Sequence, residues 1–118
     1  MSETYQIILN QQVITLSLWK AYPEQQMTCY SAFFTRIAMC RSVDLFVWDK
    51  VREGQRAGKY SLMVNGPWQR GSIRADRDTI EACEALVNAQ LHQIVQAASD
   101  FQEIPQSEWE RLKAEGYR

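Results

Sequence analysis

Basic and aromatic side chains gather in residues 59–74, a stretch with the pattern of two strands that meet at Gly66 and Pro67. Exposed rings stack on nucleic-acid bases and cationic side chains neutralise phosphates, so such a face is typical of single-stranded nucleic-acid binders. Tryptophan and arginine are also enriched at protein interfaces. The candidate binding residues are Lys59, Trp68, Arg70 and Arg74, together with Trp48 and Lys50 if the preceding strand lies alongside in register.

Strand alternation supports one common face for the four candidates in this hairpin. A symmetric fold about Gly66 and Pro67 pairs Asn65 with Trp68 and Lys59 with Arg74. Side chains alternate across a strand, so the apolar and the basic residues then separate onto opposite faces. The apolar face carries Tyr60, Leu62, Val64 and Ile73, and the basic face carries Lys59, Trp68, Arg70 and Arg74.

No catalytic or metal-binding motif accompanies this face. His92, the only histidine, falls on the outer flank of a predicted helix with no nucleophile or acid one turn away. Cys29, Cys40 and Cys83 have neither zinc-ligand nor disulfide spacing, and the five glycines match no phosphate-binding loop. We therefore predict a protein that is not an enzyme and that uses no metal or cofactor.

The charges are unevenly distributed along the chain, although the net charge is only −1. Residues 50–74 hold six basic residues against one acid, a balance of +5, whereas residues 78–118 hold eight acids against three basic residues, a balance of −5. Opposite charges of this kind can pair across a two-fold interface. We therefore favour a protein-binding or regulatory protein, including self-association as a homodimer, over the alternative of single-stranded nucleic-acid binding.

Length and composition predict a single domain over residues 1–118, because domains commonly contain about 100 to 150 residues. No apolar run approaches the roughly 20 residues of a membrane-spanning helix, so we expect no membrane partner. An odd number of cysteines without a disulfide framework suits a reducing compartment. We therefore expect a cytoplasmic location.

The first half of the chain predicts mainly strands. Residues 5–9 and 13–19 are β-rich and form a predicted hairpin, and residues 43–51 form a strand with apolar residues on both sides. Residues 23–40 are ambiguous. An apolar stripe at helical spacing favours a helix there, whereas Pro23 also suits a turn between two long strands.

The second half predicts an amphipathic helix over about residues 79–103. Asp78 and Glu81 have capping spacing, and apolar residues recur every three or four positions up to Phe101. The same capping pattern predicts a short helix over residues 107–115. The fold class is therefore α+β: an antiparallel sheet of about five strands, with the long helix packed on one face and a short C-terminal helix.

Overall fold

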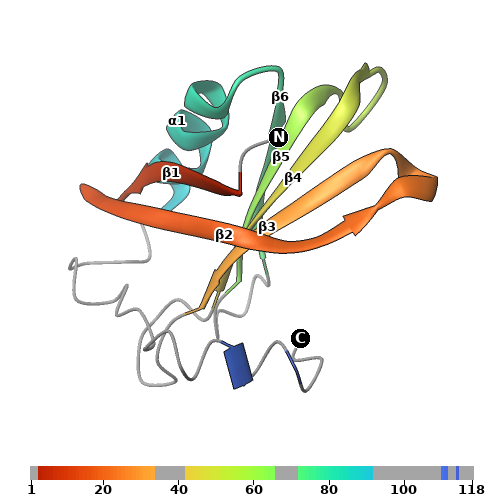
Figure 1. The fold of residues 1–118 in the computed structure, drawn as a ribbon. Helices are drawn as coiled ribbons and strands as arrows, with labels where there is room; N and C mark the ends of the chain where they lie inside the picture. Colours follow the sequence, from red (N-terminus) through yellow and green to blue (C-terminus); the bar gives the residue numbers. More distant parts are fainter. Residues whose placement is uncertain (1–2, 34–41, 66–71, 92–109, 112–113, 115–118) are drawn as a thin grey trace.

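The computed structural model describes residues 3–33, 42–65, 72–91, 110–111 and 114. It is an α+β fold in which six strands form one antiparallel sheet, each strand pairing with the next along the chain (Figure 1). The strands are β1 (Thr4–Leu9), β2 (Gln12–Tyr22), β3 (Met27–Phe33), β4 (Ser42–Arg52), β5 (Gly58–Asn65) and β6 (Ile73–Arg77), and helix α1 (Ile80–Leu91) follows β6.

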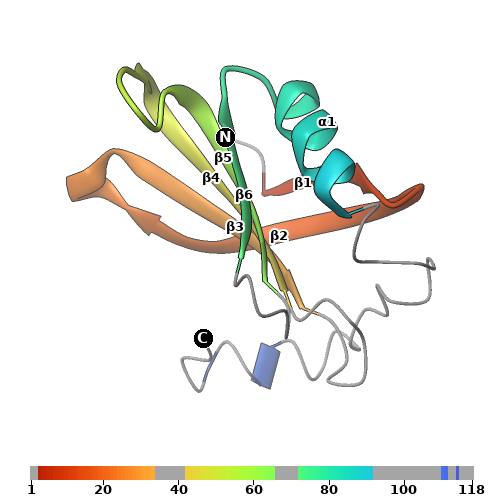
Figure 2. The ribbon, with the colours of Figure 1, turned by 180° about the vertical axis from the view of Figure 1, so that it is seen from behind.

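The sheet curls around α1, so that the edge strands β1 and β6 both lie close to the helix (Figures 1 and 2). We call the face that receives α1 the inner face and the opposite one the outer face. Leu45 and Leu62 of the inner face and Val87 of α1 are fully buried. Because burial of each such side chain contributes about 1.5 to 3 kcal/mol, this packing decides which face is inside.

The predicted N-terminal hairpin is confirmed. Strands β1 and β2 pair up to Leu9 and Gln12, which leaves a two-residue turn of Asn10 and Gln11. Both turn residues have positive φ, 50° and 64°, the conformation that tight hairpins prefer and that asparagine tolerates well. The turn fixes the register that sends Ile14 to the inner face, where it is fully buried.

The helix predicted over residues 23–40 is wrong for the part that the structure describes. Pro23–Gln25 forms a single 3-10 turn, and Gln26 adopts a left-handed φ of 55°. The chain then returns as strand β3, antiparallel to β2. The alternative interpretation of the sequence, a turn between two long strands, is what forms.

The false helical signal in this segment has a simple cause. Met27, Tyr30 and Phe33 lie three residues apart, as on one face of a helix. In the sheet, every residue from 28 to 33 is buried, so both sides of β3 carry apolar or small side chains. A segment buried on both sides cannot be assigned by periodicity alone. Residues 34–40 lie outside the described part of the chain.

The additional strand brings the sheet to six rather than the predicted five or so. Helix α1 is 12 residues long and ends at Leu91, the last residue of its described segment. Positions 92–103 of the predicted long helix lie outside the described residues. Of the predicted C-terminal helix only Glu110, Arg111 and Ala114 are described, too few to define an element. Within the described residues, no helix has the length and apolar character needed to cross a bilayer.

The N-terminus of α1 also differs in detail from the prediction. The hydroxyl of Thr79, rather than a side chain of Asp78, accepts a hydrogen bond from the backbone N–H of Ala82 at 3.1 Å. Thr79 therefore caps the helix that begins at Ile80. The predicted apolar stripe is confirmed within α1, where Cys83, Val87 and Leu91 are all fully buried.

The hairpin of β5 and β6 forms with a register four residues away from the predicted one. Arg74 pairs with Met63 rather than with Lys59, because residues 66–72 connect the strands instead of a tight corner at Gly66 and Pro67. An even shift keeps the described side chains of the paired residues 60–64 and 73–77 on their predicted faces. Leu62 therefore still points inward.

Polar side chains of α1 cover the backbone of edge strand β1. The side-chain amide of Asn88 donates to the carbonyl of Ile8 at 2.9 Å, and its oxygen accepts from the N–H of Asn10 at 2.8 Å. The carboxylate of Glu84 accepts from the N–H of Ile8. Uncovered edge strands offer such groups to other chains, so α1 also protects this edge from unwanted pairing.

The Asn88→Ala variant tests this second role of the helix. We expect the free energy of unfolding to fall by about 1 to 2 kcal/mol, because the carbonyl of Ile8 in β1 and the N–H of Asn10 in the turn lose their partner. The measurement is urea denaturation followed by circular dichroism, with Gln90→Ala as the control because Gln90 is exposed on the same helix. Equal stability of the two variants would show that the contacts of Asn88 are unimportant.

Candidate functional site

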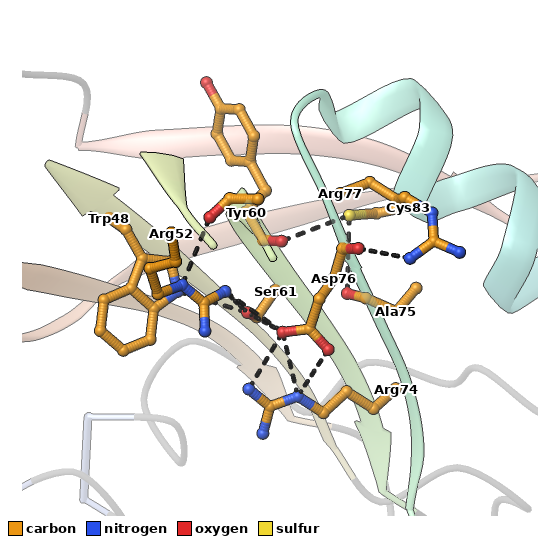
Figure 3. Close-up of polar contacts among 10 residues, drawn as sticks. Trp48, Arg52, Tyr60, Ser61, Arg74, Ala75, Asp76, Arg77 and Cys83 are labelled. Atoms are coloured by element: carbon orange, nitrogen blue, oxygen red, sulfur yellow. Dashed lines mark hydrogen bonds and ion pairs between the residues drawn. The ribbon is translucent and has the colours of Figure 1, made fainter. Parts of the chain in front are cut away.

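Five side chains from three neighbouring strands form one connected group, which we call the outer-face cluster (Figure 3). Trp48 and Arg52 come from β4, Ser61 from β5, and Arg74 and Asp76 from β6. Asp76 and Ser61 face one another directly across β5 and β6. The sheet therefore brings together residues that are far apart in the sequence and holds them on rigid strands.

Asp76 is the centre of the outer-face cluster. Its carboxylate accepts hydrogen bonds from Arg52 at 3.2 Å, from Ser61 at 2.5 Å, and from both Nε and Nη2 of Arg74 at 3.1 Å. The Asp76 side chain is only 11% exposed, whereas those of Arg52 and Arg74 are each 23% exposed. One shielded carboxylate thus orients two guanidinium groups that reach solvent.

Opposing effects act on the pKa of Asp76. Burial raises the pKa of this carboxyl group. Hydrogen bonds from Arg74, Ser61 and Arg52, together with the charge of Arg74, lower the pKa by more than burial raises it. The pKa therefore lies below its ordinary value of 3.8. Asp76 is consequently ionised at neutral pH, and the cluster of two guanidinium groups and one carboxylate carries a net charge of +1.

The indole of Trp48 is held between Arg52 and Ser61. The guanidinium carbon of Arg52 lies 4.0 Å from the ring centroid, and the indole N–H donates to the Ser61 hydroxyl at 3.3 Å. A cation in this position is attracted to the ring face. One face of the indole is therefore already occupied by a side chain of the same protein.

Ser61 is fully buried, and all its hydrogen-bonding groups are used. The hydroxyl donates to Asp76 and accepts from Arg52 and Trp48. A hydroxyl group has one proton and two lone pairs, so no capacity remains. Ser61 is therefore inaccessible and fully hydrogen-bonded, so it is not placed to act as a nucleophile.

The structure brings some predicted binding residues together and separates others. Trp48 and Arg74 both belong to the outer-face cluster, and Lys59 lines a cavity together with Trp48. Lys50 is exposed on the projecting part of β4 and is not part of the cluster. Trp68 and Arg70 lie outside the described residues.

Sequence reasoning missed Arg52, Ser61 and Asp76. Arg52 lies just beyond the strand predicted over residues 43–51, although it is the last residue of β4 and pairs with Gly58. A signal for Asp76 was present, because Arg74 and Asp76 occupy alternate positions and must share a face of any strand. The predicted binding face was defined only by basic and aromatic residues, so the acidic residue Asp76 was left out.

Other reactive groups of the described residues offer no alternative site. Cys29 and Cys83 are both buried thiols. Burial raises the pKa of the Cys83 thiol, which keeps it protonated and unreactive, as expected of a core residue. No group of three or more metal-ligating side chains occurs among the residues that the structure describes.

Comparison with known proteins found no matching family model, no similar curated protein and no similar solved structure. A functional proposal for this chain therefore rests on the geometry of the outer-face cluster and its surroundings.

Proposed function

We propose that this is a non-catalytic binding protein that docks an acidic segment of a partner protein on the outer-face cluster. The observation that carries the proposal is the sharing of one carboxylate by two guanidinium groups. Arg52 and Arg74 bond through Nε and Nη2, and neither Nη1 has a hydrogen-bond partner among the described residues. Guanidinium groups fixed in this way are suited to binding a carboxylate.

The surroundings of the cluster also favour a protein partner. Phe46 and Met63 are half-buried on the same face, opposite Ser61 and Arg74 respectively. Tryptophan and arginine are the residues that most often carry the binding energy of protein interfaces, particularly when they are held rigidly beside apolar groups. The cluster with these two neighbours has that composition.

Self-association is one form of the same proposal. The acid-rich residues 78–118 of one copy carry the charge that the cluster of a second copy would attract. Sedimentation velocity at low and high salt tests this form, because screening weakens contacts between charged surfaces. A mass that stays monomeric at high protein concentration leaves a different protein as the partner.

Single-stranded nucleic acid is the second candidate, favoured by the positive charge of the cluster and by Trp48. Base stacking, however, needs an open ring face. Arg52 already covers one face of the Trp48 indole, and the charge of both arginines is partly neutralised by Asp76. Because the Trp48 indole is partly covered and the positive charge is partly neutralised, we favour the protein partner.

The test uses fluorescence anisotropy with a labelled oligoglutamate peptide and, separately, with an oligothymidylate of the same nominal charge. We expect the peptide to bind and the Arg74→Gln variant to weaken it about tenfold, because a charge-assisted hydrogen bond contributes about 1.5 kcal/mol. Arg56→Gln is the matched control, since Arg56 is exposed in the loop of residues 53–57. Equal affinity of the two variants, or binding of the oligonucleotide alone, contradicts the proposal.

A cytoplasmic location is part of the same proposal. Both described cysteines are buried thiols, which suits a reducing compartment. Expression with a fluorescent tag, followed by microscopy and fractionation, measures the location directly.

A further inference from the structure

Three large side chains lie side by side on the outer face of the hairpin β2–β3 and the neighbouring strand β4. Tyr22 pairs directly with Met27, and Met27 pairs directly with Trp48. Directly opposite residues of antiparallel strands point to the same face of a sheet. Trp48 belongs to the outer-face cluster, so Tyr22 and Met27 lie on the same face as that cluster. We call these three residues the outer-face row.

The outer-face row is held in place and is partly open to solvent. The hairpins β2–β3 and β4–β5 project beyond α1 (Figures 1 and 2), and all three side chains of the row are half-buried. Beside the row, the backbone N–H of Asp49 donates to the carbonyl of Gln26 at 2.8 Å, which joins β4 to the turn before β3. A strip of large side chains fixed on paired strands loses little conformational freedom when a partner covers it.

A cation lies over the ring at each end of the row. The ammonium nitrogen of Lys20 is 5.2 Å from the ring centroid of Tyr22, and the guanidinium carbon of Arg52 is 4.0 Å from the ring centroid of Trp48. Cation–π attraction holds both side chains against the row. Lys20 is exposed, and no ion pair joins it to an acid among the described residues. The row therefore has a largely apolar centre between two positive ends.

The spacing of the strands sets the length of a matching partner. Neighbouring strands lie about 4.8 Å apart, so β2 and β4 are separated by about 10 Å across the row. Three residues of an extended segment span about the same distance. Three consecutive apolar residues between two acidic ends therefore match the row in both length and charge.

We propose that the outer-face row binds an extended partner segment in which about three apolar residues stand between two acidic ends. The apolar residues cover Met27 and the rings beside it, one acidic end pairs with Lys20, and the other pairs with Arg52 and Arg74. This inference rests on the proposed docking of an acidic segment and extends that surface from the outer-face cluster to β2 and β3. It adds an apolar recognition element and one further cation to the cluster.

The test is fluorescence anisotropy of the full chain with two labelled peptides of the same composition, Glu-Glu-Leu-Leu-Leu-Glu-Glu and Leu-Glu-Glu-Leu-Glu-Glu-Leu. We expect the first to bind about tenfold more tightly, because only its leucines lie together over the row. Equal affinity of the two peptides, with oligoglutamate still bound, would overturn this inference and leave the proposed docking of an acidic segment intact. Absence of binding by all three peptides would overturn both.

Two variants assign the contacts. Met27→Ala and Lys20→Gln should each weaken the peptide with the central leucines about five- to tenfold, and Met27→Ala should leave oligoglutamate binding unchanged, because that peptide brings no apolar group to the row. The controls are Val13→Ala, at an exposed apolar position of the hairpin β1–β2, and Arg56→Gln, in the exposed loop of residues 53–57.

A measurement on the wild-type chain makes the test independent of how the variants fold. The side-chain methyl NMR signal of Met27 should shift when the peptide with the central leucines is added, and it should shift much less with oligoglutamate. An unchanged Met27 signal, or wild-type affinity in both Met27→Ala and Lys20→Gln, would overturn the inference.

Discussion

The Gly58→Ala variant should lose roughly 3 kcal/mol or more of its unfolding free energy. Gly58 has a φ of +124°, and a Cβ atom there would lie 2.5 Å from the carbonyl carbon and oxygen of Arg77. Both neighbours are backbone atoms of the adjacent strand β6, so neither can move without disturbing the sheet. The strain of the positive φ adds to the clash. Thermal and urea denaturation measure the loss.

The matched control is Gly54→Ala. Gly54 also has a positive φ, +93°, but nothing lies within 4 Å of the Cβ position. Only the conformational penalty of about 1 to 2 kcal/mol applies there. Similar losses at the two positions would mean that the close approach of Gly58 to Arg77 is absent in solution.

The Asp76→Asn variant should lower the unfolding free energy by roughly 2 to 3 kcal/mol. An amide of the same shape cannot serve as acceptor for Arg52, Arg74 and Ser61 together, and it leaves two guanidinium charges without a counter-charge. Removing a charged hydrogen-bond acceptor costs about 1.5 to 3 kcal/mol, and solvent at the two arginines limits the repulsion. Asp78→Asn is the control, because Asp78 is exposed.

The same residue predicts how stability depends on pH. The pKa of Asp76 is lower in the folded protein than its ordinary value, so the stabilisation is complete above that value and is lost as the pH falls towards the folded pKa. The wild-type protein should therefore lose stability below about pH 4, and Asp76→Asn should lose less over the same interval. Parallel pH profiles for the two proteins would contradict this role.

The sequence predicted which face of the sheet each side chain occupies much better than it predicted which residues pair across neighbouring strands. Alternation placed Leu62 inward and Arg74 outward, and both assignments hold although the register of β5 and β6 is four residues away from the predicted one. Alternation repeats every two residues, so it cannot distinguish registers that differ by an even number. The length of the connection decides between them, and Gly66 and Pro67 suggested a turn that was too short.

The outer-face cluster could be predicted only in part, for a related reason. Trp48 and Arg74 were identified by residue type, but their common partner Asp76 depends on which residues of β5 and β6 face one another. The irregular pairing after Val47 was beyond prediction, because no sequence pattern signals it. Strand β3 was predicted only as the alternative to a helix, because burial of both its sides removes the alternation that marks a strand.

The most direct test of the proposed docking surface is its location by NMR. On addition of the oligoglutamate peptide to the wild-type chain, we expect the side-chain N–H signals of Arg52, Arg74 and Trp48 to shift first. The exposed apolar pair Ile8 and Val13, 53% and 59% exposed on the hairpin β1–β2, should not respond. Shifts confined to that hairpin, or no shift in the outer-face cluster, would contradict the account.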